Sequence, residues 1–388
     1  MQTAAASTVS PVTRARNIPH LVTLQLYAAS AGFCQFRGCS RHLLKHPVTK
    51  DEDNFAVRAH IYAFSKEGPR GDDAGRPEDI HDFTNLMLLC GDCHTLIDGQ
   101  PARYSVATLK NFKREHEGRI LRAALLTPDC ETVVVVVTAP IRGAHVAVPR
   151  DDVLAAISPF YPAQAQFCTV DLSDLDGETE GASFNEVACR KIDREMAKLF
   201  AGNGPVASTP RISLFAIAPM PILAHLGARL DNKIALQLYQ RHRDTQNWSW
   251  KADATRVGFT TRVMKERPRG APVAIVLSLS GTIAHNDLPA VVRSEFAIYE
   301  MTLDGVVPSP TFLNHPETLG AFAMAYHDLL GQIAADHGYV DAIDVFPAAP
   351  APIAVLLGRE RLMKRHPALR IFDADKENGG FCFQVEIK

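Results

Sequence analysis

Residues 85–94 concentrate side chains that could bind a metal ion and activate water. An Asn opens the stretch, an apolar run follows, and a Cys-x-x-Cys pair and a His close it. A Cys-x-x-Cys pair is half of a tetrahedral metal site, and a second pair lies about fifty residues upstream. The four cysteines are Cys34, Cys39, Cys90 and Cys93. Two such pairs predict a structural Zn²⁺ site, with four buried thiols and no metal as the less favoured interpretation.

Three polar residues remain in this region, and together they could hydrolyse a phosphodiester. They are His60, Asn85 and His94. The reaction needs an activated water, a divalent metal that stabilises the transition state, and a group that holds the base in place. A first strand that carries His60, an Asn before a second strand and a His on the next helix would provide these parts. The alternative is that these three residues only pack against their neighbours and have no role in chemistry. The two adjacent cysteine pairs make that interpretation less favourable.

Residues 34–120 resemble an HNH nuclease of the ββα-metal class. The resemblance is carried by the two cysteine pairs, by Ala59-His60-Ile61, by residues 85–94, and by Leu109 to Glu117 in the helix that follows. It implies that His60 is the general base and that Asn85 orients the loop that bears it. It also implies that His94 holds the catalytic metal, Mg²⁺ or another divalent ion, and that the four cysteines hold Zn²⁺.

One position departs from the HNH pattern. Many HNH enzymes carry Asp or His as a second metal ligand directly before the base, and this chain has Ala59. Another group could take the place of that ligand, and the candidates are His81, Asp82 and Asp98. The metal could otherwise be held loosely until DNA or a conformational change completes the site.

The local patterns of the front segment predict the elements that would position these residues. Spaced leucines predict a helix over 20–31 that Gly32 ends, and Ser105 is the expected cap of a helix over 105–126. Residues 84–89 read as a strand, residues 94–97 as a short helix, and residues 66–79 as a loop rich in Gly, Pro and charge. The predicted fold of residues 1–126 is an α+β, zinc-stapled ββα-metal domain behind a loose tail, 1–17.

Composition is typical of a globular protein. The 388 residues are 46% apolar and 22% charged, with a formal net charge of −2. The front segment has a small excess of basic residues, which is compatible with phosphate contacts without proving them. No signal-like segment is expected in residues 1–17, and the longest apolar run, Val133 to Val137, is too short to span a membrane. Paired cysteines favour reduced thiols, so a cytoplasmic protein without membrane contact is expected.

Beyond Thr127 the pattern changes to buried strands that alternate with helices, which predicts an α/β domain over 127–388. This part contains an internal repeat, because residues 212–227 align with 343–358 at an offset of 131, including both prolines and the glycine of each copy. First strands at 133–137 and 273–277 and helices at 184–200 and 316–337 also correspond. Trp248 and Trp250 align with Phe381 and Phe383 at an offset of 133. The predicted fold is a duplicated α/β unit with halves of about 131–258 and 271–388.

Each copy runs from a strand through Pro-x-Pro into a helix, and free N–H groups at a helix start can bind phosphate. Ligands of open α/β sheets lie at the carboxyl ends of strands. Two copies related by a pseudo-two-fold axis would present similar half-sites to one ligand. A ligand with approximate two-fold symmetry of its own, such as a cyclic oligonucleotide, would match that arrangement.

Residues 131–388 resemble a SAVED domain, a fusion of two CARF-like, Rossmann-type sensor units that binds cyclic oligonucleotide second messengers. The residues that carry the resemblance are the two repeat copies at 212–227 and 343–358. An HNH domain followed by a SAVED domain is the layout of effector nucleases in CBASS, a bacterial anti-phage system. The resemblance implies a cyclic di- or trinucleotide as ligand.

Topology and side-chain chemistry suggest which residues contact this ligand. The predicted set is Thr138, Arg142, Pro219, Trp248, Trp250, Lys251, Ser280 and Pro350. Aromatic rings stack on bases and Lys pairs with phosphate. Alternate aromatic residues on one strand face could equally be core, so the two tryptophans have both interpretations.

The sequence therefore predicts a metal-dependent endonuclease that cuts double-stranded DNA when a cyclic nucleotide binds. Cutting both strands would require two sites, so a homo-oligomer is expected, a dimer or, on activation, a tetramer. The alternative function is a ligand-responsive DNA-binding regulator in which the cysteine region recognises DNA without cutting it. Ala59 favours that alternative, and the set of His60, Asn85 and His94 disfavours it.

Overall fold

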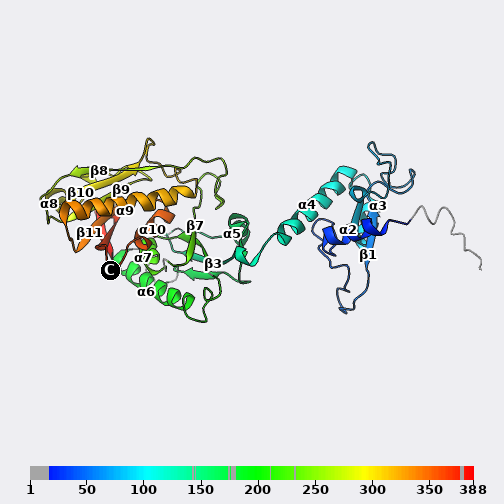
Figure 1. Ribbon diagram of the computed structural model, residues 1–388, viewed down its shortest axis with the longest axis horizontal. Coiled ribbons are helices and arrows are strands. Elements are labelled where there is room, and N and C mark those ends of the chain that lie inside the picture. The colour runs from blue at the N-terminus through cyan, green and yellow to red at the C-terminus, as the bar shows by residue number, and fades with distance from the viewer. Residues whose placement is uncertain are drawn as a thin grey trace, which may run out of the picture. The chain divides into compact units, whose positions relative to one another are not determined.

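The computed structural model describes residues 17–388, apart from 142–143, 145, 174, 176–180, 210, 231–232 and 376–379. Two compact units make up the protein, and the chain passes from one to the other between Thr127 and Pro128 (Figure 1). Each unit has its own hydrophobic core. None of the described helices combines the length and apolar character that crossing a bilayer requires.

The first unit is a small antiparallel β-pair surrounded by helices. Its elements are α2 (His20–Ser30), β1 (Ala56–His60), η1 (Phe83–Asn85), β2 (Leu86–Cys90), α3 (Gly91–Gly99) and α4 (Val106–Ala124). The predicted helices at 20–31 and 105–126, the strand at 84–89 and the loop at 66–79 are confirmed. β1 pairs with β2 so that His60 lies opposite Leu86 and Ala56 opposite Cys90.

Local chemistry explains where these elements begin and end. Helix α2 ends because Ala31 and Gly32 both adopt positive φ, at 50° and 74°. The Ser105 hydroxyl accepts a hydrogen bond of 3.3 Å from the Thr108 amide and so caps α4, as predicted. Helix α3 begins at Gly91, earlier than the predicted start at residue 94, because Cys90 is already its extended N-cap residue. The Cys-x-x-Cys turn is therefore the first turn of α3.

The second unit contains two mainly parallel sheets. The elements before residue 250 are η2 (Pro128–Cys130), β3 (Glu131–Thr138), α5 (Arg150–Ile157), β4 (Tyr161–Pro162), β5 (Cys168–Asp171), α6 (Gly181–Leu199), β6 (Arg211–Ile217), α7 (Met220–Arg229) and β7 (Ala235–Tyr239). Those after it are β8 (Phe259–Lys265), β9 (Val273–Ser278), η3 (His285–Asp287), α8 (Ala290–Glu295), β10 (Ala297–Leu303), α9 (Glu317–His337), β11 (Ala342–Ala348), α10 (Ala351–Arg359), β12 (Ala368–Asp375) and β13 (Gly380–Ile387). The predicted strands and long helices of both halves are confirmed.

The two sheets share a strand order. In the first sheet β3 lies between β5 and β6, β4 extends the β5 side, and β7 forms the other edge. In the second sheet β9 lies between β10 and β11, followed by β12. The second sheet carries two further antiparallel strands, β8 beside β10 and β13 beside β12. Strand β12 is thus covered by β13, whereas its counterpart β7 ends its sheet.

Matching aromatic clusters fill the two halves. Phe215 on β6 stacks on Tyr239, with ring centroids 4.4 Å apart, and meets Trp248 edge to face at 5.2 Å. Phe346 on β11 repeats this arrangement with Phe372 at 4.7 Å and Phe381 at 5.3 Å. The alignment of Trp248 with Phe381 therefore describes equivalent packing positions.

The prediction that Trp248 and Trp250 share one face of a strand is wrong. Phe381 and Phe383 lie in β13, but residues 248–250 belong to no strand. Trp248 needs only an extended chain to reach Phe215, and no ladder of hydrogen bonds joins this segment to β7. Side-chain alternation therefore identified the inward-facing residue without identifying the backbone partner.

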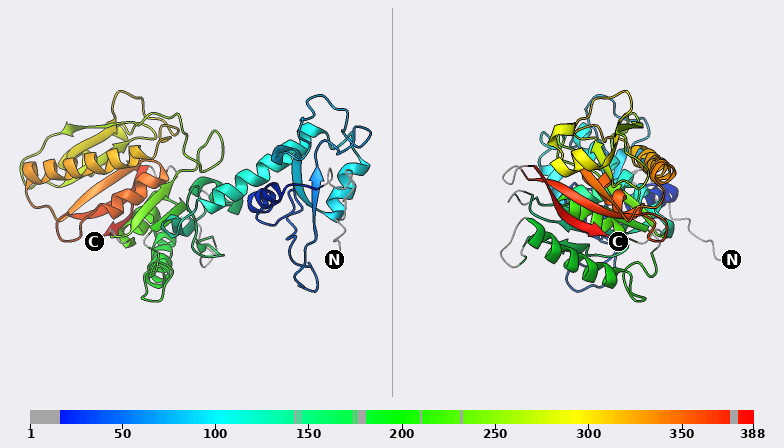
Figure 2. Two further views of the ribbon diagram at one scale, coloured as in Figure 1. Left: turned by 45° about the vertical axis from the view of Figure 1, so that its right-hand side comes forward. Right: turned by 90° about the vertical axis from the view of Figure 1, so that its left-hand side faces the viewer.

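Helices α7 and α10 pack on each other between the two sheets (Figure 1). Their contact is made by the glycines of the repeat. A Cβ atom on Gly227 would lie 1.8 Å from the carbonyl oxygen of Val355, and a Cβ atom on Gly358 would lie 1.8 Å from that of Ala224. Each contact is the other shifted by the repeat offset, so the two helices meet through equivalent positions. Helix α6 packs on α7 and reaches β13, where Asn185 donates a hydrogen bond of 2.8 Å to Gln384 (Figure 2).

Replacing Gly227 with alanine is expected to destabilise the second unit by about 3 kcal/mol, because the new methyl group would overlap the backbone of α10. The thermal midpoint should fall by roughly 5–10 °C. Gly331→Ala in α9 is the matched control, since its Cβ atom would have no neighbour within 4 Å and alanine favours helix. Equal midpoints for the two variants in thermal unfolding would contradict this helix contact.

Candidate functional site

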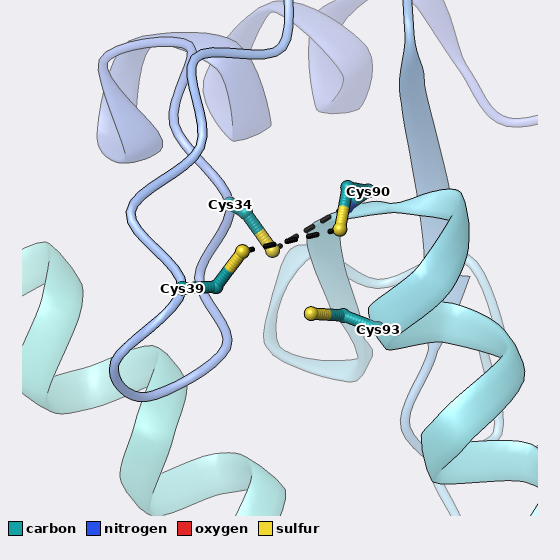
Figure 3. Close-up of side chains that lie close together, drawn as sticks. All are labelled: Cys34, Cys39, Cys90 and Cys93. Carbon is teal, nitrogen blue, oxygen red and sulfur yellow. Dashed lines mark hydrogen bonds between the residues drawn. The ribbon is translucent and has the colours of Figure 1, made fainter. Parts of the chain in front are cut away.

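The four predicted cysteine ligands come together where β2 ends and α3 begins. The sulfur atoms of Cys34, Cys39, Cys90 and Cys93 all lie within 4.8 Å of one another (Figure 3). The Sγ atoms of Cys39 and Cys90 are 3.9 Å apart, and the Cys90 amide donates a hydrogen bond of 3.3 Å to Cys34 Sγ. We refer to these residues as the cysteine cluster.

The donor set of the cysteine cluster fits Zn²⁺. Four sulfurs at about 2.3 Å from a tetrahedral Zn²⁺ lie roughly 3.8 Å apart, close to the Cys39–Cys90 separation. Burial raises the pKa of Cys34 to about 12, so a nearby cation is needed to hold its sulfur as the thiolate that binds metal. Cys34, Cys90 and Cys93 are buried and Cys39 is half-buried, which are the closed surroundings typical of structural metal sites.

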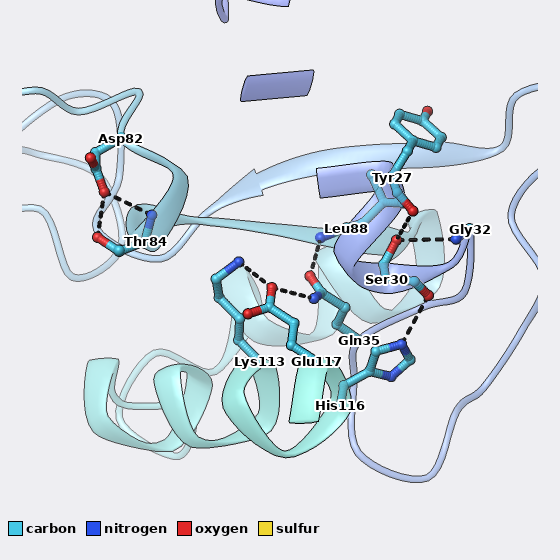
Figure 4. Close-up of polar contacts among 10 residues, drawn as sticks. All are labelled: Tyr27, Ser30, Gly32, Gln35, Asp82, Thr84, Leu88, Lys113, His116 and Glu117. Carbon is cyan, nitrogen blue, oxygen red and sulfur yellow. Dashed lines mark hydrogen bonds and ion pairs between the residues drawn. The ribbon is translucent and has the colours of Figure 1, made fainter. Parts of the chain in front are cut away.

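The cysteine cluster is held to the rest of the unit by a buried polar network (Figure 4). Gln35 accepts a hydrogen bond of 2.7 Å from the Leu88 amide and donates one of 3.0 Å to Glu117 of α4. Lys113 donates to the same carboxylate at 2.5 Å and is itself buried beneath the Phe83 ring. Lys113 is therefore engaged inside the unit and does not face a phosphate backbone.

Asn85 connects the end of β1 with the start of β2. Its side-chain oxygen accepts a hydrogen bond of 2.8 Å from the Tyr62 amide, and its side-chain nitrogen donates to the carbonyl oxygens of Tyr62 and Ile80 at 3.2 and 2.9 Å. Asn85 is 1% exposed, so its amide is committed to these three bonds. It fixes the loop that follows His60 and does not itself meet solvent.

His60 ends β1 beside another histidine. Its Nε2 atom lies 3.3 Å from Nδ1 of His81, within hydrogen-bonding distance. Burial lowers the pKa of His60 to about 4, and His81, Arg76 and His94 act in the same direction. The imidazole is therefore neutral near pH 7, which is the form that can accept a proton.

His94 and Asp98 share one face of α3. Because they are four residues apart, one turn of helix brings the Nε2 atom of His94 within 3.3 Å of an Asp98 carboxylate oxygen. The other Asp98 oxygen accepts a hydrogen bond of 2.8 Å from Arg70. Helix α3 packs on β1, and the same Arg70 side chain donates a hydrogen bond of 2.8 Å to the carbonyl oxygen of Ile61, so His94 and Asp98 lie near the end of β1.

Arg70 is the buried link between these parts. Its guanidinium donates to the carbonyl oxygen of Ile61, directly after His60, and to that of Ile97 on α3, at 2.8 and 2.9 Å. A third bond reaches Asp98. This role could not be predicted from the sequence, since an Arg in a Gly- and Pro-rich loop resembles a solvated charge. The neighbouring Gly71, whose Cβ would lie 2.4 Å from a carbonyl oxygen of Ser65, lets the loop fold tightly enough to bury it.

The three candidates for the ligand missing at Ala59 have different surroundings. Asp82 accepts from the Thr84 amide at 2.8 Å and caps η1, so it is engaged away from α3. His81 lies against His60, and Asp98 lies against His94. Within the described ranges, only the cysteine cluster brings three or more metal-binding side chains as close as 4.8 Å.

In the second unit, four predicted ligand residues lie at the carboxyl ends of the sheets. Thr138 ends β3 beside Ile217, and Pro219 leads directly into α7. The Ser280 amide donates a hydrogen bond of 2.7 Å to the carbonyl oxygen of Ala348. Two residues later, Pro350 leads into α10. The structure therefore pairs Thr138 with Pro219 in one half and Ser280 with Pro350 in the other.

The remaining predicted ligand residues differ in environment. Trp248 is 1% exposed in the core, which favours the packing interpretation for it. Trp250 is half-buried and meets His242 edge to face at 5.8 Å. Lys251 forms an ion pair of 2.5 Å with Asp244. Arg142 lies outside the described residues.

Comparisons with known proteins find two domain families in the chain. Residues 34–99 match the HNH endonuclease family, and residues 195–387 match the SMODS-associated and fused to various effectors sensor domain, SAVED. No curated protein was found to match the chain.

Solved structures similar to this chain include two Cap4 SAVED/CARF-domain containing receptors. The receptor from Acinetobacter baumannii with the cyclic trinucleotide 3′3′3′-cAAA is 15% identical, with a TM-score of 0.46 over 75% of this chain and 62% of that receptor. The receptor from Moraxella osloensis is 15% identical, with a TM-score of 0.41 over 82% of this chain and 71% of that receptor. This chain thus spans less than two thirds of the Acinetobacter receptor. The chain combines an HNH endonuclease domain at residues 34–99 with a SAVED sensor domain at residues 195–387.

Proposed function

We propose that this protein is a metal-dependent endonuclease that cleaves double-stranded DNA when a cyclic di- or trinucleotide binds its second unit. The observation that carries the proposal is the group of His60, His94 and Asp98 near the end of β1, held by the buried side chains of Asn85 and Arg70. The SAVED match supports control by a nucleotide. In this role the protein acts in the bacterial cytoplasm as an effector of CBASS anti-phage immunity.

His60 is the general base of the proposed reaction. When its Nε2–H is donated to Nδ1 of His81, the lone pair on Nδ1 of His60 is available for the proton of the attacking water. Asn85 keeps the base in place by fixing the loop that follows it. His81 is a positioning group that selects this tautomer.

His94 and Asp98 are the proposed holders of the catalytic divalent metal. An imidazole and a carboxylate oxygen suit Mg²⁺, Mn²⁺ or a similar ion. When bound, this ion would stabilise the charge that develops on the phosphate and the leaving oxygen. Arg70 occupies one Asp98 oxygen and leaves the other directed toward His94, so Asp98 is the candidate for the ligand missing at Ala59.

We further infer that residues 1–126 form the nuclease domain and that residues 127–388 form a SAVED domain of two CARF-like copies, about 131–258 and 271–388. The shared strand order, the equivalent aromatic clusters and the reciprocal glycine contacts of α7 and α10 support the duplication. Cleavage of both DNA strands needs two nuclease sites, so the active species is a homo-oligomer, a dimer or a tetramer.

Plasmid digestion tests the function. Supercoiled DNA is incubated with Mg²⁺ and a panel of cyclic di- and trinucleotides, with EDTA and ligand-free reactions beside it. The expected result is linear DNA with one or a few of the nucleotides and none with EDTA. Equal cutting without nucleotide would exclude the proposed regulation. Retention of DNA in a gel-shift assay without any nicking would favour the DNA-binding regulator instead.

The pH profile of cleavage should be flat near neutrality. Since burial lowers the pKa of His60 to about 4, the base form dominates above about pH 5, and acidification to pH 4 should protonate about half of it. Cleavage is expected to vary less than about twofold between pH 6 and 8 on account of His60. An unshifted histidine would lose half of its base form at about pH 6.5. Initial nicking rates across pH 4.5–8 distinguish the two cases.

A further inference from the structure

Helix α4 carries three exposed basic side chains on the side that faces away from the core of the first unit. They are Lys110, Arg114 and Arg122, at spacings of four and eight residues. Since residues four apart are neighbours on a helix surface, the three follow one another along one side of α4. Leu109 and His116 belong to the buried side instead. We refer to the three basic residues as the α4 cation row.

Gly118 occupies the gap in this row, four residues after Arg114 and four before Arg122. A Cβ atom on Gly118 would lie 3.4 Å from Nη1 of Arg122, so the Arg122 side chain reaches back to the helix backbone at this position. Long helical side chains ordinarily point in that direction. With a rise of 1.5 Å per residue, residues 110–122 span about 18 Å. Double-stranded DNA carries one negative charge per roughly 1.7 Å of its axis, so a row of this length can meet several phosphates.

The two other Lys and Arg side chains of α4 are engaged inside the protein. Lys113 is buried and donates a hydrogen bond of 2.5 Å to Glu117 (Figure 4). Arg119 lies 3.2 Å from Nδ1 of His116, whose Nε2 atom lies 3.0 Å from the carbonyl oxygen of Ser30. These two cations therefore hold the unit together, which distinguishes them from the α4 cation row.

Within the described part of the chain, no carboxylate forms an ion pair with the row. The second acidic residue of α4, Glu115, lies 3.5 Å from Nε of Arg37. Arg114 donates a hydrogen bond of 2.5 Å to Asn111, which is uncharged. The positive charge of the row is therefore not neutralised by the protein, and such a surface attracts a polyanion.

The row begins beside the loop that follows the proposed base. Nζ of Lys110 lies 5.2 Å from the ring centroid of Tyr62, two residues after His60. Tyr62 is held on both sides, because its amide donates a hydrogen bond of 2.8 Å to Asn85 and its hydroxyl donates one of 3.1 Å to the carbonyl oxygen of Ala74. A phosphate backbone that follows the row toward the start of α4 would thus arrive at the candidate site.

We propose that the α4 cation row binds the phosphate backbone of double-stranded DNA and leads one strand to His60. The inference rests on the proposed function, because it names the surface by which the same site holds its substrate. Phosphate contacts fix the position of a duplex and carry no direct sequence information. The row would therefore contribute to the affinity for DNA of any sequence and set the position at which the backbone enters the site.

The double variant Arg114→Gln/Arg122→Gln in the full-length protein tests this surface. Glutamine is uncharged and is nearly as good a helix former as arginine, so α4 should persist. Each lost phosphate contact reduces the slope of log affinity against log salt concentration by about 0.9, so the slope should fall by about 2. Binding of a fluorescent duplex should weaken by roughly 10- to 100-fold at about 100 mM salt. Adding Lys110→Gln should reduce the slope by about 1 more.

Lys45→Gln/Lys50→Gln is the matched control. Both residues are exposed in the segment between α2 and β1 of the same unit, and their replacement removes the same charge from the chain. The affinity and the salt slope of this variant should equal those of the wild type. Fluorescence anisotropy without added Mg²⁺, with and without each cyclic nucleotide of the digestion panel, measures binding separately from cleavage. Thermal unfolding should give the wild-type midpoint for both double variants.

The outcomes separate this surface from the proposed function. Equal duplex affinity and equal salt slopes in the two double variants would overturn the role of the row and leave the regulated nuclease intact. The same sequence is also titrated as single-stranded DNA and as double-stranded RNA, and tighter binding of either would overturn the assignment to double-stranded DNA. Duplex affinity that depends on the row, in a protein that never nicks plasmid, would support the row and exclude the nuclease in favour of the DNA-binding regulator.

Discussion

Cys93→Ser is expected to unfold the first unit and abolish DNA cleavage while the second unit stays folded. The sulfurs of the cysteine cluster come from the loop after α2 and from the β2–α3 turn, so a metal ion bound there would join segments that are far apart in the chain. Structural Zn²⁺ sites contribute on the order of 10 kcal/mol to the folding of small domains. A serine hydroxyl is a poor zinc ligand, so this contribution is largely lost.

Metal analysis and thermal unfolding measure the effect. The wild-type protein should contain one Zn²⁺ per chain, and Cys93→Ser close to none, with an early unfolding transition for the first unit alone. Cys382→Ser is the matched control, because Cys382 lies in β13 of the second unit, apart from the cysteine cluster. A zinc-free Cys93→Ser protein that still cuts DNA at the wild-type rate would refute the structural role of the metal.

His60→Ala is expected to lower the rate of DNA cleavage by about 10²- to 10⁴-fold, the usual contribution of a general base. The fold should persist, because His60 is only half-buried and its loop is held through Asn85 and Arg70. DNA affinity and cyclic-nucleotide affinity should change little. The effect would therefore fall on the turnover rate and not on binding.

Single-turnover cleavage at saturating enzyme isolates this step. His20→Ala is a suitable control, since His20 is an exposed residue at the start of α2 in the same unit. The unfolding midpoints of both variants should match the wild type. A His60→Ala protein that cleaves as fast as His20→Ala would exclude His60 as the base and direct attention to His81.

The fold could be predicted from the sequence wherever a sequence pattern itself causes the structural feature. Paired cysteines predict their own cluster, because only a shared ligand requires that spacing. The repeat predicts equivalent elements. The structure explains why both copies carry glycine at positions 227 and 358, because the backbones of the two helices approach each other closely there. Helix caps such as Ser105 act within one turn and so are visible locally.

Other features depend on contacts between segments far apart in the chain. The order of strands in the sheets, the loss of a β13 counterpart beside β7, and the burial of Trp248 beside a half-buried Trp250 follow from tertiary packing. One alternating pattern, Trp248 and Trp250, fits a paired strand or an unpaired extended segment equally well. Whether a neighbouring strand hydrogen-bonds to the segment decides between these two structures, and the alternation of side chains does not specify that neighbour.

The same distinction between local sequence pattern and tertiary contacts applies to the candidate site. Residue types and spacing determined by themselves that His60, Asn85, His94 and the four cysteines belong together. His94 and Asp98 are one turn apart on α3, so their pairing is local, and only the tertiary structure showed that Arg70, from the loop after β1, joins Asp98 to the carbonyl oxygen of Ile61 beside the base. A buried arginine in a polar loop looks like a surface charge until the carbonyl oxygens that it binds are known. Sequence spacing thus fixes which groups can react, and the long-range hydrogen bonds of the folded chain fix how they are held.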